Sequence, residues 1–265
     1  MKNIYVLFLI IFVSNLYPDV KKKAVIIGAT SGMGRQIAIL LAKEGYELGL
    51  VGRRLNLLES LQAELKTKVV IKRIDVCDKE KAIDQVGELV DNLGGMDLMV
   101  ISISSFVDSM FEKSFEVDKK TLDVDLVGFW YMADFAVRYF EKQNYGHLVG
   151  ISSMSGLRGD ARCPVYCGVK AFISTYLEGI RNKMIQAKLP IYVTDVVPGW
   201  VDNEAITFSE KPGTYWVVST IEAAGQIVKA IKAKKKRAFI MPRQFLIALL
   251  LWHMPDSIYN WIGGF

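Results

Sequence analysis

The fold is decided by one stretch near the N-terminus, Lys23-Ala24-Val25-Ile26-Ile27-Gly28-Ala29-Thr30-Ser31-Gly32-Met33-Gly34. Its first half is an apolar run typical of a buried strand, and an amphipathic helical pattern follows its glycines. Glycines at a strand-to-helix turn let the backbone approach a ligand, and the helix N-terminus offers N–H groups and a positive dipole end to a pyrophosphate. The stretch therefore predicts a dinucleotide site at Gly28, Thr30, Ser31, Gly32, Met33 and Gly34, with an ordinary tight turn as the alternative.

Outward from this stretch, apolar segments alternate with amphipathic ones. Strands are expected at 24–28, 47–52, 69–74, 97–103, 147–152, 190–197 and 238–241. The alternation predicts an α/β fold, a single-domain Rossmann-like, doubly wound parallel sheet of about seven strands with helices on both faces. With 265 residues, 51% hydrophobic, the chain is long enough to bury a full core.

Three segments are expected along the chain. An apolar N-terminal segment at 1–20 precedes a dinucleotide-binding and catalytic domain at 21–242, and an apolar extension occupies 243–265. Within the domain, residues 199–217 form a long irregular connection that predicts a substrate lid. Aromatic side chains in this lid indicate an apolar substrate, or else they anchor the loop to the core.

Two arginines, Arg53 and Arg54, follow the second expected strand, where a dinucleotide fold places the residue that faces the adenosine ribose. A carboxylate there would accept hydrogen bonds from the ribose hydroxyls of NAD, whereas a guanidinium attracts a 2′-phosphate. The pair therefore favours NADP over NAD. The alternative, which fits Arg54 better than Arg53, is a solvated arginine that begins the next helix.

A tyrosine and a lysine, Tyr166 and Lys170, stand four residues apart at the start of an expected helix. This spacing puts both side chains on one helix face. A nearby lysine cation favours the phenolate, so the pKa of the tyrosine, about 10 when unperturbed, is expected to fall toward the range of proton transfer at neutral pH. The pair is a design for protonating a carbonyl oxygen.

Together these motifs resemble the short-chain dehydrogenase/reductase family, over residues 23 to about 242. Further family motifs recur in order: Asp75-Val76 after the third expected strand, Pro198-Gly199-Trp200-Val201 after the sixth, and Ser153, thirteen residues before Tyr166. The resemblance implies that Asp75 and Val76 hold the adenine ring and that Pro198, Gly199 and Val201 close over the nicotinamide.

By the same resemblance, hydride passes between the nicotinamide and a ketone or alcohol substrate while Tyr166 donates or accepts the proton. Ser153 would hydrogen-bond the substrate oxygen, and Lys170 would lower the pKa of Tyr166 and bond the nicotinamide ribose. The family also implies a homodimer or homotetramer that pairs through residues 122–142 and 166–187. The competing interpretation is an NADP-binding regulator or scaffold with little turnover.

Two positions depart from the family pattern. Residues 101–104 read Ile-Ser-Ile-Ser in place of Asn-Asn-Ala-Gly, and Asp125 replaces the asparagine 28 residues before the serine. That asparagine helps to lead protons to the lysine, so Asp125 joins the expected catalytic residues. Its charge would oppose lowering of the pKa of Tyr166 and shift the pH profile.

The cysteine and histidine counts and the net charge argue against several classes of function. Three cysteines form no metal spacing and indicate a reducing compartment, and only two histidines occur, so no metal site and no histidine-based triad are expected. A net charge of +5 is modest, and no motif indicates nucleic-acid binding. An NADP enzyme draws on the cytoplasmic cofactor pool, so a cytoplasmic location is expected.

Both ends carry apolar runs. Residues 4–13 are too few for a membrane-spanning helix and are interpreted as an anchor, an uncleaved leader or a translated upstream extension. Residues 245–252 follow a basic run, 232–237. An apolar run beside a basic run predicts contact with anionic lipid at the inner face of a membrane. The alternative is that residues 245–252 pack on the core or on another subunit.

Overall fold

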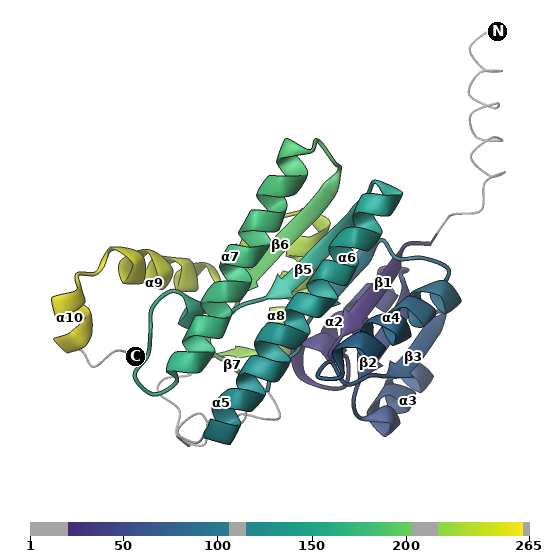
Figure 1. Cartoon of the computed structure of the whole chain (residues 1–265), viewed down its shortest axis with the longest axis horizontal. Helices are drawn as coiled ribbons and strands as arrows, with labels where there is room; N and C mark the ends of the chain where they lie inside the picture. Colours follow the sequence, from purple (N-terminus) through teal and green to yellow (C-terminus); the bar gives the residue numbers. More distant parts are fainter. Residues whose placement is uncertain (1–20, 106–114, 203–216, 262–265) are drawn as a thin grey trace, which may run out of the picture.

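Seven parallel strands form one sheet in the order β3-β2-β1-β4-β5-β6-β9 in the computed structural model, which describes residues 21–105, 115–202 and 217–261 (Figure 1). The strands are β1 (Lys23–Ile27), β2 (Glu47–Gly52), β3 (Val69–Arg73), β4 (Leu98–Ile101), β5 (Gly146–Ile151), β6 (Ile191–Val197) and β9 (Arg237–Phe239). The predicted doubly wound parallel sheet is confirmed. Only β4 is clearly shorter than predicted, since it ends at Ile101 rather than at residue 103.

Helices cover both faces of the sheet. One face carries α4 (Lys79–Leu93), α6 (Phe129–Gln143) and α7 (Pro164–Gln186), and the other carries α2 (Gly32–Lys43), α3 (Leu55–Glu64) and α8 (Thr220–Lys232). Each layer has its own apolar cluster against the strands. Because both faces are covered, β5 is buried at every position and, apart from His147, does not alternate between apolar and polar residues.

Local sequence explains where several helices begin and end. Pro164 starts α7, where its missing N–H costs nothing. Gly94 and Asn144 adopt left-handed backbone angles directly after α4 and α6 (φ +87° and +63°), the conformation that ends a helix. These stops turn the chain back into β4 and β5.

The path from β4 to α6 contains an unusual turn. After α5 (Phe115–Thr121) the chain forms a seven-residue π-helical segment, η2 (Leu122–Gly128), which runs directly into α6. Such wide turns are rare and occur often at functional sites. Here η2 carries Asp125, the residue that departs from the family pattern.

The remaining described elements are a short helix η3 (Met154–Gly156), a small parallel ladder of β7 (Val201–Asp202) with β8 (Val218–Ser219), and two C-terminal helices, α9 (Pro242–His253) and α10 (Asp256–Trp261). The two helices occupy the expected C-terminal extension. Most of the predicted lid, at 203–216, and the N-terminal segment 1–20 lie outside the described residues. Within the described part of the chain no helix has the length and apolar character that crossing a bilayer requires.

Candidate active site

The glycine-rich turn joins β1 to α2. Gly28 has a φ of +93°, and a Cβ there would lie 2.3 Å from the carbonyl oxygen of Ser102. A Cβ on Gly34, in the first turn of α2, would lie 2.1 Å from the carbonyl oxygen of Gly28. Both positions therefore require glycine, and the backbone of the turn stays in close contact with α2 and β4.

The other predicted residues of this turn surround the start of α2. Gly32 has a φ of +56°, Met33 follows it, and Ser31 is the N-cap residue. The Ser31 side chain does not cap the helix. The first-turn N–H groups of α2 are thus without a side-chain cap at the position where the sequence predicts a pyrophosphate.

Arg54 reaches across to this turn. Its Nη2 donates hydrogen bonds to Thr30 Oγ1 at 2.8 Å and to Ser31 Oγ at 2.6 Å. Arg54 is exposed and is the N-cap residue of α3, as the alternative of a solvated arginine at the start of the next helix expects, and it is in addition hydrogen-bonded to the turn. Arg53 lies close enough to Cys77, which follows Asp75-Val76, for its charge to oppose the effects of burial and Asp75 that raise the pKa of this thiol.

The predicted adenine and nicotinamide segments lie at the ends of β3 and β6. Asp75 Oδ1 accepts from the Cys77 backbone N–H at 3.1 Å, and Val76 is buried against Gly128 of η2. The Pro198 carbonyl accepts from the Met154 N–H at 2.9 Å, so this segment is joined to η3.

The neighbouring Gly199 donates its N–H to Gln244 Oε1 of α9 at 3.0 Å, and Val201 is buried in β7. Gln244 is 2% exposed, and its Nε2 has no hydrogen-bond partner among the described residues. Sequence reasoning missed Gln244, for which the only signal was a polar residue at the edge of an apolar run.

Ser153, Tyr166 and Lys170 come together where β5 ends and α7 begins. Ser153 is the N-cap of η3, and its hydroxyl oxygen accepts from the Ser155 N–H at 3.1 Å. On α7, Lys170 Nζ lies 5.4 Å from the centroid of the Tyr166 ring. The Ser153 and Tyr166 hydroxyls are hydrogen-bonded, so two polar oxygens are side by side near one ammonium group.

Ser152 has a different partner from Ser153. Its hydroxyl donates to Asp195 Oδ1 at 2.6 Å and lies 3.0 Å from the carbonyl oxygen of Val196. Both contacts join β5 to β6, so Ser152 belongs to the sheet while Ser153 faces Tyr166.

Asp125 brings the two departures from the family pattern into contact. This carboxylate is fully buried and lies 3.6 Å from Lys170 Nζ. It accepts from Ser104 Oγ at 2.8 Å and from the Ser105 N–H at 2.5 Å. Sequence reasoning missed Ser104 and Ser105 as partners of Asp125, since they stand 21 and 20 positions before it in the chain.

The electrostatics of Tyr166 differ from the prediction. Burial raises the pKa of Tyr166 above its ordinary value, Asp125 raises it further, and the hydrogen bond with Ser153 opposes both. The prediction that this pKa lies below its ordinary value is therefore wrong for the chain alone, whereas the effect of Asp125 has the predicted sign. Burial lowers the pKa of Lys170, and Asp125 counteracts this. At neutral pH the phenol of Tyr166 is thus protonated.

Two of the three cysteines lie next to the candidate site. Cys163 and Cys167 are buried beside Tyr166 with their sulfur atoms 3.8 Å apart, and Cys77 is exposed. Among the described residues no three histidine, cysteine or acidic side chains are grouped so that they could hold a metal ion.

Comparison with known proteins decides the family. A family model described as short chain dehydrogenase matches residues 22–212. The chain is a member of the short-chain dehydrogenase family. It is an oxidoreductase, a dehydrogenase of the class that uses NAD or NADP.

Two curated relatives of this dehydrogenase show the extent of the similarity. An uncharacterized oxidoreductase of Staphylococcus aureus (strain USA300) is 32% identical over 194 residues, which cover 72% of this chain and 82% of the relative. An uncharacterized oxidoreductase of Mycobacterium tuberculosis (strain CDC 1551 / Oshkosh) is 29% identical over 251 residues, 90% of this chain and 96% of the relative.

Solved structures agree on the fold. A 7β-hydroxysteroid dehydrogenase matches with a TM-score of 0.77 at 19% identity over 92% of this chain and 97% of its own. ElxO with NADP bound matches with a TM-score of 0.72 at 21% identity over 83% of this chain and 97% of its own. At these identities the likeness shows that the dehydrogenase shares their architecture, while substrate and cofactor preference must be argued from its own residues.

Proposed function

We propose that this short-chain dehydrogenase uses NADP(H) to interconvert a ketone and an alcohol, with Tyr166 as the acid and base. The observation that carries the proposal is the grouping of Ser153, Tyr166 and Lys170 around a buried carboxylate, Asp125. A dinucleotide-binding regulator would need the glycine turn but not this grouping. The two curated relatives described above, both named as oxidoreductases, also favour an enzyme.

The residues of the turn fit a dinucleotide. The Gly28–Gly34 contact leaves no room for side chains between β1 and α2, and the uncapped N-terminus of α2 favours a pyrophosphate. Gln244 Nε2, a buried donor beside Gly199, lies next to the segment that resembles the nicotinamide site. When bound, NADPH would supply the hydride.

Side chains of the protein would transfer the proton and stabilise the charge that results. Tyr166, protonated at neutral pH, would donate its phenolic proton to the carbonyl oxygen as the carbon accepts hydride. Ser153 would donate a hydrogen bond to the same oxygen and fix its position. Lys170, held 3.6 Å from Asp125, would stabilise the phenolate that remains.

The two arginines support the NADP preference. Arg54 is fixed at Thr30 and Ser31 by two hydrogen bonds, so a guanidinium stands at the edge of the predicted pyrophosphate turn. Arg53 is the second cation near this edge. Guanidinium groups pair with phosphate by two parallel hydrogen bonds, a geometry that a ribose hydroxyl cannot exploit as fully. Use of the NADP pool places the enzyme in the cytoplasm in this proposal.

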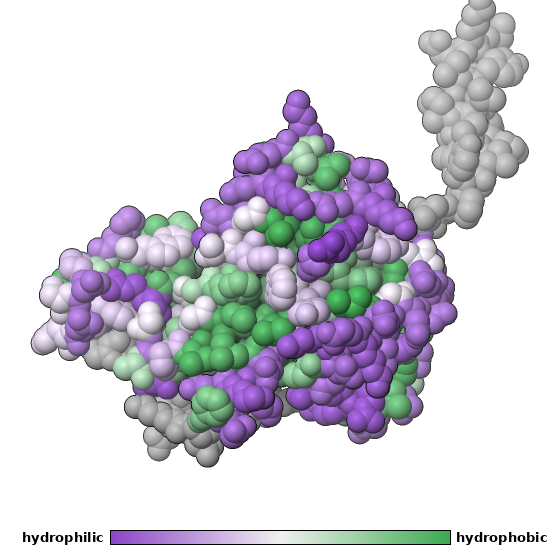
Figure 2. Space-filling view, viewed as in Figure 1, coloured by the Kyte–Doolittle hydropathy of each residue, from purple (hydrophilic) through white to green (hydrophobic). Residues whose placement is uncertain are grey.

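The exposed face of α6 and α7 supports a homodimer or homotetramer. Figure 2 shows hydrophobic atoms gathered over α7 and the neighbouring part of α6. Trp130 and Phe172 are 43% and 37% exposed, and Tyr176 between them stacks on Phe172 at 5.6 Å. An apolar face of this kind favours burial against a second copy. The substrate is proposed to be an apolar carbonyl compound or alcohol.

The test is NADPH consumption against a panel of carbonyl compounds, with NADPH binding followed separately by fluorescence. We expect Tyr166→Phe to bind NADPH normally and to lose at least about a hundredfold in turnover. Tyr145→Phe, at an exposed tyrosine, is the matched control and should turn over normally. Turnover that survives in Tyr166→Phe would overturn the mechanism, and tighter binding of NADH than of NADPH would overturn the cofactor preference.

A further inference from the structure

Helix α9 turns its large apolar side chains outward. Its inward face consists of Gln244, Ala248 and Leu251. Its outward face carries large side chains that are substantially exposed: Phe245 (42%), Leu246 (67%), Leu250 (59%) and Trp252 (41%). A surface helix of a globular domain normally presents polar residues to water. The inverted pattern indicates that another apolar phase covers this face.

Helix α10, which follows α9, also carries exposed apolar side chains, and hydrogen bonds from Arg158 hold the junction of the two helices. Ile258 and Trp261 of α10 are 48% and 85% exposed. Arg158, from the segment after η3, donates to the Met254 carbonyl at 2.7 Å and to Asp256 Oδ1 at 2.6 Å. In Figure 1 the two helices form one end of the molecule, beyond α7. The exposed side chains therefore lie on helices that are fixed to the rest of the domain.

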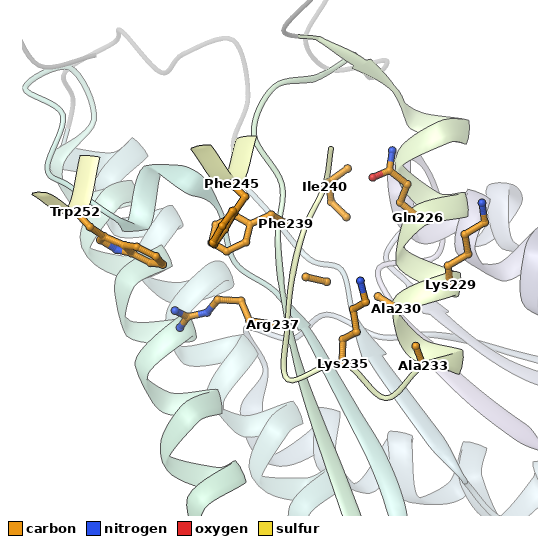
Figure 3. Close-up of a pocket in the computed structure, with 11 residues that line it drawn as sticks. Gln226, Lys229, Ala230, Ala233, Lys235, Arg237, Phe239, Ile240, Phe245 and Trp252 are labelled. Carbon is orange, nitrogen blue, oxygen red and sulfur yellow. The ribbon is translucent and has the colours of Figure 1, made fainter. Parts of the chain in front are cut away.

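A hollow of about 750 Å³ lies where α9 meets α8 and β9 (Figure 3). One side is aromatic, because Phe239 lies 5.3 Å from Phe245 and 6.0 Å from Trp252 between ring centroids. The other side carries Lys229 and Lys235. Apolar and cationic groups thus share one depression, an arrangement that fits an amphiphile with an anionic head.

The cations beside the hollow are in excess. Residues 229–237 contain six lysines and arginines and no acidic residue. Lys232 is paired with Glu44, and Arg237 with Asp195. Among the described residues, Lys229 and Lys235 have no carboxylate within ion-pairing distance. Their ammonium groups can therefore pair with an anion from outside the protein.

We propose that the α9–α10 face docks on a lipid bilayer that contains anionic lipid. Phe245, Leu246, Leu250 and the two tryptophans enter the headgroup boundary, and Lys229 and Lys235 meet the lipid phosphates. With 12 residues, about 18 Å, α9 is shorter than the hydrocarbon core and lies in the plane of the surface.

A second copy of the chain fits this face less well than lipid does. A two-fold contact would place the same patch on both subunits, so the unpaired lysines of one copy would approach those of the other. The face offers little opposite charge, since Asp256 is its acidic residue and is already held by Arg158. The apolar face of α6 and α7 is separate and is available for assembly.

The test is co-sedimentation of the full chain with vesicles of phosphatidylcholine alone or with added phosphatidylglycerol. We expect binding to the anionic vesicles and a loss of affinity of about tenfold or more in Leu246→Gln/Leu250→Gln and in Lys229→Gln/Lys235→Gln. Matched controls are Ile185→Gln/Ile221→Gln, at similarly exposed positions on α7 and α8, and Lys66→Gln/Lys142→Gln. Both controls should bind like the parent chain.

Three outcomes would overturn the proposal. In the first outcome the parent chain does not bind the anionic vesicles. In the second outcome Leu246→Gln/Leu250→Gln binds them as well as the parent chain does, which would assign the contact to residues 4–13. In the third outcome Leu246→Gln/Leu250→Gln lowers the molecular mass by light scattering, which would make the face an interface between copies. The measurement requires no turnover, so it stands apart from the proposed reaction.

Discussion

Asp125 sets the charge around the reacting hydroxyl. It is buried, faces Lys170 at 3.6 Å and raises the pKa of Tyr166. It accepts one hydrogen bond from the hydroxyl of Ser104, the last residue of the segment that departs from the family pattern, and one from the backbone N–H of Ser105, which follows that segment. These two hydrogen bonds therefore offset the free-energy cost of burying the Asp125 carboxylate.

Asp125→Asn should move the pH profile. Without the carboxylate charge the pKa of Tyr166 falls, so alcohol oxidation, which needs the phenolate, should begin at a pH about one unit lower. Carbonyl reduction, which needs the protonated phenol, should decline at correspondingly lower pH. Lys170, Cys163 and Cys167 are the other titratable groups near the phenol and are retained. The measurement is kcat against pH in both directions.

Ser104→Ala is the control for this change. It removes the hydrogen bond to Asp125 Oδ2 and keeps the charge, so the profile should stay in place. A profile of Asp125→Asn that is unshifted, or shifted to higher pH, would contradict the assigned role of the carboxylate.

Arg54→Ala should weaken NADPH more than NADH. The guanidinium is fixed at Thr30 and Ser31, and losing one charged hydrogen-bond partner of a phosphate costs about tenfold in affinity. We therefore expect the KM for NADPH to rise roughly tenfold while the KM for NADH changes less. Arg138→Ala, an exposed arginine of α6, serves as the control. Equal effects on the two cofactors would mean that Arg54 only braces the turn.

At the scale of elements, the turn that follows β1 lies in close contact with α2. Gly34→Ala would place a Cβ 2.1 Å from the Gly28 carbonyl oxygen, so the helix or the turn must move. We expect a stability loss of about 1–3 kcal/mol in urea unfolding together with weakened NADPH binding. Gly87→Ala is the matched control, because no atom lies within 4 Å of the added Cβ in α4. It should be neutral or stabilising.

Features set by neighbouring residues were predictable from the sequence. The apolar runs of β1 and β5, and the four-residue spacing of Tyr166 and Lys170, are local patterns that fix an element or a shared face. Contacts between distant residues were not. The strand was predicted to run to residue 103, but β4 ends at Ile101, and the Ser105 N–H bonds to Asp125, 20 residues away, instead of to a neighbouring strand.

The hydrogen bonds of Arg54 were hidden for the same reason, since they span 23 and 24 residues. The pKa of Tyr166 was misjudged because spacing shows the lysine but not the depth of burial. Composition gave the apolar character of α9, and only the tertiary structure shows that its large side chains face outward.

At the scale of the molecule, the C-terminal helices are tied to both sides of the candidate site. Gln244 of α9 binds the Gly199 N–H, and Arg158, which follows the Ser153 segment, holds the junction of α9 and α10. A bilayer surface on which α9 docks, as proposed above, would therefore be fixed relative to the segments that carry Gly199 and Ser153.

Assembly should depend on a different region, the apolar face of α6 and α7. Phe172→Glu would place a charge beside Tyr176 and Trp130, and burying an unpaired charge in a subunit interface is strongly unfavourable. We expect the molecular mass by light scattering to fall toward that of the 29.8 kDa chain. Ile221→Glu, at a 66% exposed position of α8 on the other side of the sheet, is the matched control and should retain the parent mass. If the Phe172 variant keeps the parent mass while Ile221→Glu dissociates, the subunits pair through the α8 side instead, and the face of α6 and α7 must have another partner.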